Sequence, residues 1–278
     1  MNYDVVIGVG CSFMNGDRIL NNSGKCIGKQ FVSGLVLSEK LKCDYVHMGN
    51  TGSSNERMFK NIYEWVENNN ETGHYEKPLF IIGLSGTARY MFYSEHKERY
   101  FDLQPAHVNS YDDKALTSIN EKLTDKVGKL QDLRNWLTYY MQWLYNDEQN
   151  DLKLQREVMM LHHYLKGNNC DYRIHNSLQD SLGNIKKKIN YISFIDNQYK
   201  GQDNWTDSTN LQDTWRDFLV WQMENIDNEP FEVRKETTEY TSEKYRSPFP
   251  PYGKRFCQGH PSPNANKELA ERIYEDLK

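Results

Sequence analysis

The first 90 residues alternate short apolar runs with amphipathic stretches, and this alternation restricts the chain to a parallel α/β sheet. The runs at 4–9, 45–48 and 79–82 are apolar and rich in branched side chains, and a glycine follows each of them. The stretches 29–42 and 53–70 between them carry apolar residues at helical spacing. Strands of this kind are buried on both faces, and strand–helix–strand units with short connections form parallel sheets with right-handed crossovers.

The start of the second of these helices has its own signal. Ser53 is followed three residues later by Glu56. This spacing fits a capping box, in which each of the two side chains binds the free backbone amide of the other residue. We therefore expect the helix to begin at Ser53.

The second half of the chain is more helical. Between 114 and 146 apolar residues recur every three or four positions, which predicts one long helix, and 151–166 predicts a second helix that forms a hairpin with it. Further strands are predicted at 170–174 and 191–195, further helices at 211–225 and 265–277, and a rigid loop at 247–253. We expect a three-layer, flavodoxin-like α/β fold in a single domain, 1–278, with a helical insertion at about 110–168.

Composition excludes several classes of function. The chain has 34 Lys and Arg against 39 Asp and Glu, a net charge of −5, and no basic block, so nucleic-acid binding is not expected. No apolar run is long enough to span a membrane, and the first residues lack the features of a signal peptide, so we expect a cytoplasmic protein. Five widely spaced cysteines without a CxxC pair indicate reduced thiols. No cluster has metal-ligand spacing and no dinucleotide motif is complete, so we expect neither metal nor cofactor.

Polar, glycine-bearing motifs follow the first three predicted strands, at the carboxyl ends where parallel sheets bind ligands. They lie at 10–16, 49–55 and 83–89, and a fourth motif at 259–264 precedes the last helix. A serine after the first strand and a histidine near the C-terminus are able to meet across the sheet edge. Acyl transfer needs such a set, namely a hydroxyl nucleophile, an imidazole base and amide donors for the oxyanion.

Together these motifs resemble the sequence blocks of the SGNH (GDSL-like) hydrolases, and most closely those of the SGNH-like proteins of tailed bacteriophages. Gly10-Cys11-Ser12 resembles the first block, with Cys11 in place of the usual aspartate. Asn50-Thr51-Gly52 resembles the second block and His260-Pro261 the last. The resemblance covers roughly 4–92 and 256–276.

The resemblance implies a role for each matching residue. Ser12 would be the nucleophile and His260 the general base. The amide of Gly52 would bind the oxyanion, together with Ser85 or Asn50. The substrate would be a small-molecule or carbohydrate ester, and the location would be the host cytoplasm if a phage encodes the protein.

Two departures from the family pattern keep a second interpretation open. Ser85 stands where the third block of the family supplies an asparagine, and no aspartate follows it. Cys257 and Gln258 occupy the positions before His260 where the family has an acid. A carboxylate stabilises the imidazolium that forms during catalysis, and neither residue does so. The alternative to an esterase or sugar deacetylase is a catalytically degenerate module that binds a glycan, a nucleotide or a protein partner.

Further residues are candidates for substrate binding or assembly. We expect Asn55 and Arg89 to bind substrate, although pairing of Arg89 with a surface acid is the slightly favoured alternative. Aromatic residues crowd the region 136–145, and we expect most of them in the core: Trp136, Tyr139, Tyr140, Trp143 and Tyr145. Part of this stripe could instead line a sugar-binding groove or the interface of a homo-oligomer.

Overall fold

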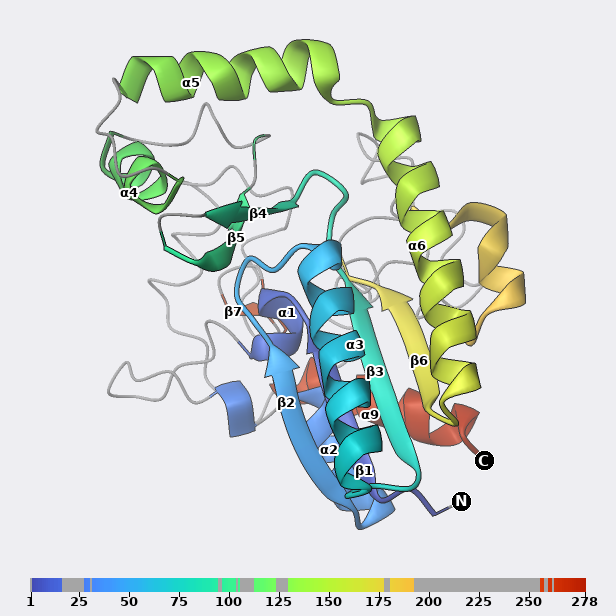
Figure 1. Cartoon of the computed structure of the whole chain (residues 1–278). Helices are drawn as coiled ribbons and strands as arrows, with labels where there is room; N and C mark the ends of the chain where they lie inside the picture. The colour runs from blue at the N-terminus through green and yellow to red at the C-terminus, as the bar shows by residue number, and fades with distance from the viewer. Residues whose placement is uncertain are drawn as a thin grey trace, which may run out of the picture.

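A parallel four-stranded sheet forms the centre of the protein in a computed structural model of the chain (Figure 1). The structure describes residues 2–16, 28–30, 32–94, 97–103, 105, 113–123, 130–177, 181–192, 256–257, 260–261 and 263–278. In spatial order the strands are β2 (Asp44–Gly49), β1 (Val5–Gly10), β3 (Pro78–Leu84) and β6 (Asp171–Asn176). Tyr191 adds a parallel bridge to Ile174 of β6. This order is that of flavodoxin-like sheets and confirms the predicted α/β fold.

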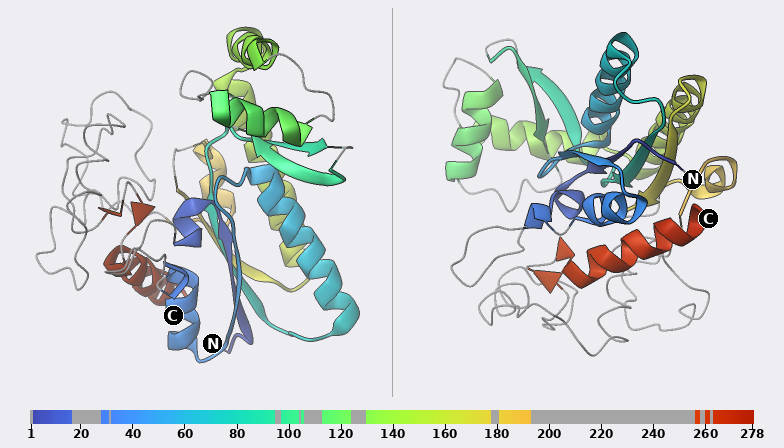
Figure 2. Two further views of the ribbon diagram at one scale, coloured as in Figure 1. Left: turned by 90° about the vertical axis from the view of Figure 1, so that its left-hand side faces the viewer. Right: turned by 90° about the horizontal axis from the view of Figure 1, so that it is seen from below.

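Helices cover both faces of the sheet and make three layers (Figure 2). On one face α2 (Ser33–Leu41), preceded by a short 3-10 turn, η1 (Gly28–Gln30), packs against α9 (Pro263–Asp276). On the other face lie α3 (Asn55–Thr72) and α6 (Asp147–Gly167). Every residue of β1 and β3 is buried, because helices cover both sides of these central strands. The predicted helices at 29–42, 53–70, 151–166 and 265–277 are thus present, with shifted ends.

The segment between β3 and β6 departs most from the prediction. It begins with an antiparallel hairpin, β4 (Tyr90–Ser94) and β5 (Arg99–Leu103), that the sequence analysis does not predict. The single long helix expected over 114–146 is wrong: α4 (Asp113–Leu123) and α5 (Leu130–Tyr139) are separate helices that pack on each other, and a π-helical turn, η3 (Tyr140–Leu144), follows. The expected hairpin of this region with α6 is also wrong, because α6 turns away from α5 and runs beside α3 (Figure 1).

The hairpin and the two helices α4 and α5 stand over the carboxyl end of the sheet (Figure 1). They have a small apolar cluster of their own, built on Leu103, Leu116 and Leu137. The much larger main cluster lies between the sheet and its covering helices. The region that covers the sheet edge is therefore packed separately from the core below it.

The start of α3 also differs from the prediction. The N-cap is Ser54, one residue later than expected, and its backbone N and side-chain Oγ both donate to Asp102 Oδ1 of β5, at 2.9 and 2.6 Å. The Glu56 side chain does not return to Ser53. Its Oε2 accepts from the backbone N of Met91 in β4 at 2.8 Å. The capping box is wrong because partners distant in sequence satisfy this helix end and use this carboxylate.

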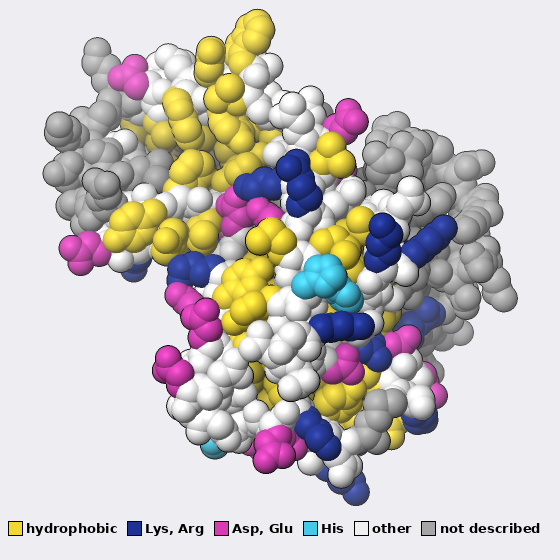
Figure 3. Space-filling view, turned by 45° about the vertical axis from the view of Figure 1, so that its right-hand side comes forward, with side chains coloured by type: hydrophobic (Ala, Val, Ile, Leu, Met, Phe, Trp, Pro, Cys, Tyr) yellow, Lys and Arg dark blue, Asp and Glu magenta, His cyan; other side chains and the backbone are white. Residues whose placement is uncertain are grey.

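The aromatic stripe is more exposed than the sequence suggests. None of its five aromatic residues is buried, and Trp136, Tyr139 and Trp143 are 41%, 56% and 72% exposed. Apolar side chains accordingly gather at the upper end of the molecule in Figure 3. The expectation that most of these residues are in the core is therefore wrong.

Some predictions fall where the structure describes nothing. The helix at 211–225, the loop at 247–253 and residues 193–195 of the last predicted strand lie outside the described residues. Among the helices that are described, none has both the length and the apolar character needed to cross a bilayer.

Candidate functional site

A row of glycines supports the turn that carries Ser12. Gly49, Gly10 and Gly83 are aligned in register across β2, β1 and β3 at the carboxyl end of the sheet. A Cβ added at Gly10 would lie 2.3 Å from Met14 Cγ, one at Gly83 would lie 2.7 Å from the same atom, and one at Gly49 would lie 2.9 Å from the Met14 carbonyl oxygen. The short helix α1 (Ser12–Asn15) therefore rests directly on the sheet, where only glycine leaves room for it.

Ser12 is the first residue of this turn. The backbone N atoms of Met14 and Asn15 both donate to the Cys11 carbonyl at 3.0 Å, and Gly16 ends the helix in the left-handed conformation. The Ser12 side chain is only 6% exposed, and no hydrogen bond joins its hydroxyl to another described residue. The hydroxyl is thus fixed by a tight turn and available to a partner or ligand.

The structure brings the backbone of His260 to the same turn. The short strand β8 (His260–Pro261) lies beside α1, with Cα atoms of the two elements within 8 Å of each other. An antiparallel pairing with β7 (Phe256–Cys257) places Cys257 opposite His260. Two segments almost 250 positions apart in the sequence therefore meet at the carboxyl end of β1 (Figure 2).

The turn with Asn50 and Gly52 adjoins α1 on the side of β2. The backbone N of Asn50 donates to the Gly10 carbonyl at 2.9 Å, and Asn15 Nδ2 donates to Thr51 Oγ1 at 3.2 Å. Gly52 has φ +74°, a conformation that favours glycine. The side chain of Asn50 is exposed. The two predicted donors of this turn thus lie next to the helix that carries Ser12.

Ser85 is held from two sides. Asn55 Nδ2 donates to the Ser85 carbonyl at 3.0 Å, and the Ser85 amide donates to Asn55 Oδ1 at 2.8 Å. Arg89 Nη1 donates to Ser85 Oγ at 2.8 Å. Because the hydroxyl accepts from a guanidinium, its own hydrogen is free to point toward another acceptor. Asn55, which the sequence predicts to bind substrate, thus forms two hydrogen bonds with the Ser85 backbone.

A series of hydrogen bonds, which was not predicted from the sequence, connects β2 to α1. Tyr45 Oη and His47 Nδ1 are 2.9 Å apart, and His47 Nε2 and Asn15 Oδ1 are 2.8 Å apart. Burial raises the pKa of Tyr45, so its hydroxyl stays protonated and donates to His47. The amide of Asn15 then continues the chain to the Gly52 turn. Tyr45, His47 and Gly49 alternate along one strand, a period-two signal that points all three to one face.

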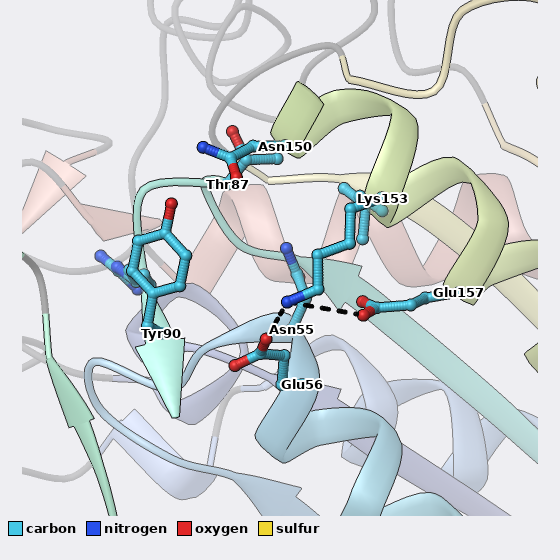
Figure 4. Close-up of a pocket in the computed structure, with 9 residues that line it drawn as sticks. Asn55, Glu56, Thr87, Tyr90, Asn150, Lys153 and Glu157 are labelled. Atoms are coloured by element: carbon cyan, nitrogen blue, oxygen red, sulfur yellow. Dashed lines mark hydrogen bonds and ion pairs between the residues drawn. The ribbon is translucent and has the colours of Figure 1, made fainter. Parts of the chain in front are cut away.

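A polar pocket opens between the start of α3, the β3–β4 loop and α6 (Figure 4). Its lining includes six polar or charged residues that matter for its chemistry: Asn55, Glu56, Arg89, Tyr90, Lys153 and Glu157. We call it the α3–α6 pocket. Lys153 of α6 forms an ion pair with Glu56 Oε1 and lies 3.8 Å from Glu157 Oε1. Burial works to lower the pKa of Lys153, but the two carboxylates outweigh it and the pKa is raised.

His175 is a second histidine that the sequence analysis passed over. It pairs with Gly83 in the β3–β6 register and is 1% exposed. Burial lowers its pKa to about 3, so the imidazole is neutral at physiological pH. His175 Nε2 and Ser177 Oγ lie 2.9 and 2.7 Å from the position that a Gly83 Cβ would take. Two buried polar side chains thus lie against Gly83 at the end of the glycine row.

No group of three or more His, Cys, Asp or Glu side chains in the described part of the chain is arranged to hold a metal ion. The groups around Ser12 and Ser85 include hydroxyls, amides and the Arg89 guanidinium. Their chemistry suits hydrogen bonding to oxygen atoms of a ligand.

Comparisons with known proteins give only distant similarities. Neither a protein-family model nor a curated protein matches the sequence. A solved structure from Desulfitobacterium hafniense DCB-2, assigned to the G-D-S-L family of lipolytic proteins, aligns over 98% of this chain and 98% of its own, with 10% identity and a TM-score of 0.38. A second solved structure, of a protein from Parabacteroides merdae ATCC 43184 described as a GDSL-like lipase, aligns over 100% of this chain and 98% of its own. The identity is 13% and the TM-score is 0.37. Scores this low do not establish a common fold.

Proposed function

We propose that the protein is a serine-dependent hydrolase of carboxylic esters. The observation that carries the proposal is the meeting of β8, with His260, and the tight turn that begins with Ser12 at the carboxyl end of the sheet. A hydroxyl on a rigid turn beside an imidazole-bearing strand is the arrangement that nucleophilic acyl transfer uses.

In this mechanism Ser12 Oγ attacks the ester carbonyl carbon while the imidazole of His260 takes the hydroxyl proton. The negative charge that develops on the carbonyl oxygen is stabilised by the backbone amide of Gly52 and by Ser85 or Asn50. The C–O bond to the alcohol breaks, and the imidazolium gives its proton to the departing alkoxide. A water molecule, activated by the same imidazole, then hydrolyses the acyl–Ser12 ester.

The arrangement of Ser85 supports its role as a donor. Arg89 donates to the Ser85 hydroxyl, which polarises the hydroxyl and leaves its hydrogen available to the oxyanion. Two hydrogen bonds from Asn55 fix the backbone of the same residue. A donor of this kind is held in place before the oxyanion forms, so it needs no reorganisation during the reaction.

The substrate class that we propose is a small ester, with the O-acetyl group of a sugar as one example. The segment over the carboxyl end of the sheet, α4, α5 and the β4–β5 hairpin, would select the substrate, because the chemistry belongs to the sheet edge below it. The oligomeric state and a cytoplasmic location in a phage-infected cell stay predictions of the sequence.

A fluorophosphonate probe tests the proposal, because it modifies a serine that a base activates. We expect the full chain to be labelled, and Ser12→Ala and His260→Ala each to lose the labelling. Ser118→Ala and His163→Ala, at exposed positions on α4 and α6, are the matched controls and keep it. Circular dichroism of every variant separates loss of labelling from loss of folding.

A second candidate function is binding without catalysis. Cys257 faces His260 in the β7–β8 pairing and supplies no carboxylate to orient the imidazole. If the folded wild-type chain takes up no probe, the hydrolase proposal fails. The degenerate module that binds a glycan, a nucleotide or a protein then becomes the leading function.

A further inference from the structure

Arg89 is a partly buried guanidinium without a carboxylate partner in the described part of the chain. Its Nη1 donates to Ser85 Oγ at 2.8 Å. Its Nε is buried and makes no hydrogen bond to any described group. No ion pair joins Arg89 to any acidic residue that the structure describes, which departs from the surface pairing favoured by the sequence. Because a buried donor without a partner is unfavourable, an arrangement of this kind indicates a ligand.

The acids of the α3–α6 pocket are occupied by other groups. Glu56 Oε1 pairs with Lys153, and Glu56 Oε2 accepts from the backbone N of Met91 at 2.8 Å. Glu157 Oε1 lies 3.8 Å from Lys153 Nζ. Figure 4 shows Lys153 between the two carboxylates. Both carboxylates of the pocket thus face Lys153, and neither of them forms an ion pair with Arg89.

The geometry of the guanidinium defines the ligand. Ser85 uses Nη1, which leaves the edge formed by Nε and Nη2, where two N–H bonds point in parallel. That edge matches two oxygen atoms of one carboxylate or phosphate in a bidentate contact. We propose that the substrate of the esterase described above carries a carboxylate or phosphate group, which binds the Nε–Nη2 edge of Arg89.

This inference rests on the proposed function and specifies the class of ester that the protein would hydrolyse. Arg89 also donates to the Ser85 hydroxyl, which we propose as a donor to the ester carbonyl oxygen. The anionic group and the ester group of the substrate would therefore lie close together. The specific substrate is thus a short anionic ester, and neutral esters of the same size are poor ligands.

Ligand-observed NMR titrations test the inference without any catalysis. The Ser12→Ala chain keeps esters intact and is titrated with monomethyl succinate, which carries one carboxylate, and with its neutral counterpart dimethyl succinate. We expect the monoester to bind about tenfold more tightly, as one bidentate ionic contact implies. Adding Arg89→Gln removes this preference, and adding Arg89→Lys keeps part of it, because lysine retains the charge without the planar fork.

Arg156→Gln is the matched control. Arg156 is exposed on α6, where its Nε donates to the Leu152 carbonyl, and it does not line the pocket. This variant changes the net charge by the same amount and should keep the tenfold preference. Competition by sodium acetate and by sodium phosphate then separates the two sources, since the stronger competitor identifies carboxylate or phosphate as the preferred group.

The outcomes separate this inference from the proposed function. Equal binding of the two succinate esters, or a preference that survives Arg89→Gln, overturns the inference while probe labelling of Ser12 still supports the hydrolase. Preference for the monoester in a chain that the probe does not label refutes the esterase and, with it, the assignment of the anion to a substrate. Labelling together with an Arg89-dependent preference supports both.

Discussion

His175 shows how burial alone changes the chemistry of a single residue. It lies at the carboxyl end of β6 with 1% of its surface exposed, beneath the region where α1 rests on the sheet. Burial lowers its pKa to about 3, whereas a histidine in the unfolded chain titrates near 6.5. Below pH 6.5 the unfolded chain therefore binds a proton that the folded chain does not bind, and acid favours unfolding.

We predict that the folded state loses stability steeply between pH 6.5 and pH 4, and that His175 contributes about 3 kcal/mol of this loss. The contribution is fully present above the unfolded pKa and disappears as the pH falls toward 3. His175→Asn removes the titrating group and should make the profile flatter. Urea unfolding at several pH values measures it. An unchanged slope in His175→Asn would refute the assignment, and His74→Asn, at an exposed position, is the control.

At the scale of elements, the position of α1 depends on what β1, β2 and β3 lack. The three aligned glycines leave a flat surface, and the backbone and side chain of Met14 occupy the space where Cβ atoms would stand. At Gly49 the neighbour is backbone, with the Met14 carbonyl oxygen at 2.9 Å and its carbon at 3.0 Å from an added Cβ. A backbone neighbour cannot move aside by changing a rotamer.

Gly49→Ala should therefore shift α1 and with it Ser12. We expect a loss of about 1–3 kcal/mol in the free energy of unfolding, typical of overpacking, and a clear decrease in fluorophosphonate labelling. Gly167→Ala is the control, because Gly167 ends α6 with nothing within 4 Å of an added Cβ. That variant should be neutral or slightly stabilising. Equal stability of the two variants would mean that α1 does not rest on this row.

At the start of α3, contacts with distant segments override the local sequence pattern. A serine and a glutamate three residues apart were enough to predict a helix start, and a helix does start here. Its cap, however, is Ser54, because Asp102 of β5 binds the amide and hydroxyl of that residue. Glu56 pairs with Lys153 of α6, 97 positions away. Contacts that arise only after folding decided which serine caps the helix.

At the scale of the whole molecule, two separate apolar clusters stabilise different parts of the described structure. The main cluster joins the sheet to α2, α3, α6 and α9, and the smaller one joins α4 and α5 to the β4–β5 hairpin. Small, separately packed clusters open more easily than a central core. The part that we propose to select the substrate is thus able to open while the edge of the sheet that carries Ser12 stays folded.

Leu137→Ala tests this division. Leu137 is fully buried in the smaller cluster, and we expect the change to cost about 2–4 kcal/mol locally, since it leaves a cavity. Hydrogen exchange should accelerate in α4 and α5 while the amides of β1 and β3 stay protected. Tyr139→Ser, on the same helix but 56% exposed, should leave both regions nearly unchanged. Equal acceleration throughout the sheet would show one cooperative unit instead.

The sequence by itself determined the parallel sheet, because each buried strand is a local apolar run followed by a glycine, and each covering helix has its own period. It also determined which residues follow the strand ends, and so placed Ser12, Gly52 and Ser85 at one edge. Local patterns carry this information because a residue's position along a strand or helix depends mainly on its near neighbours.

Only the tertiary structure decided which side chains form hydrogen bonds with one another. The clamp of Asn55 on Ser85, the chain from Tyr45 through His47 to Asn15, and the unpaired edge of Arg89 all depend on contacts between distant segments. The β4–β5 hairpin and the exposed face of α5 likewise follow from which surfaces meet. Such contacts carry no periodic signal in the chain, since a hydrogen bond across the fold needs only that two side chains arrive at the same place.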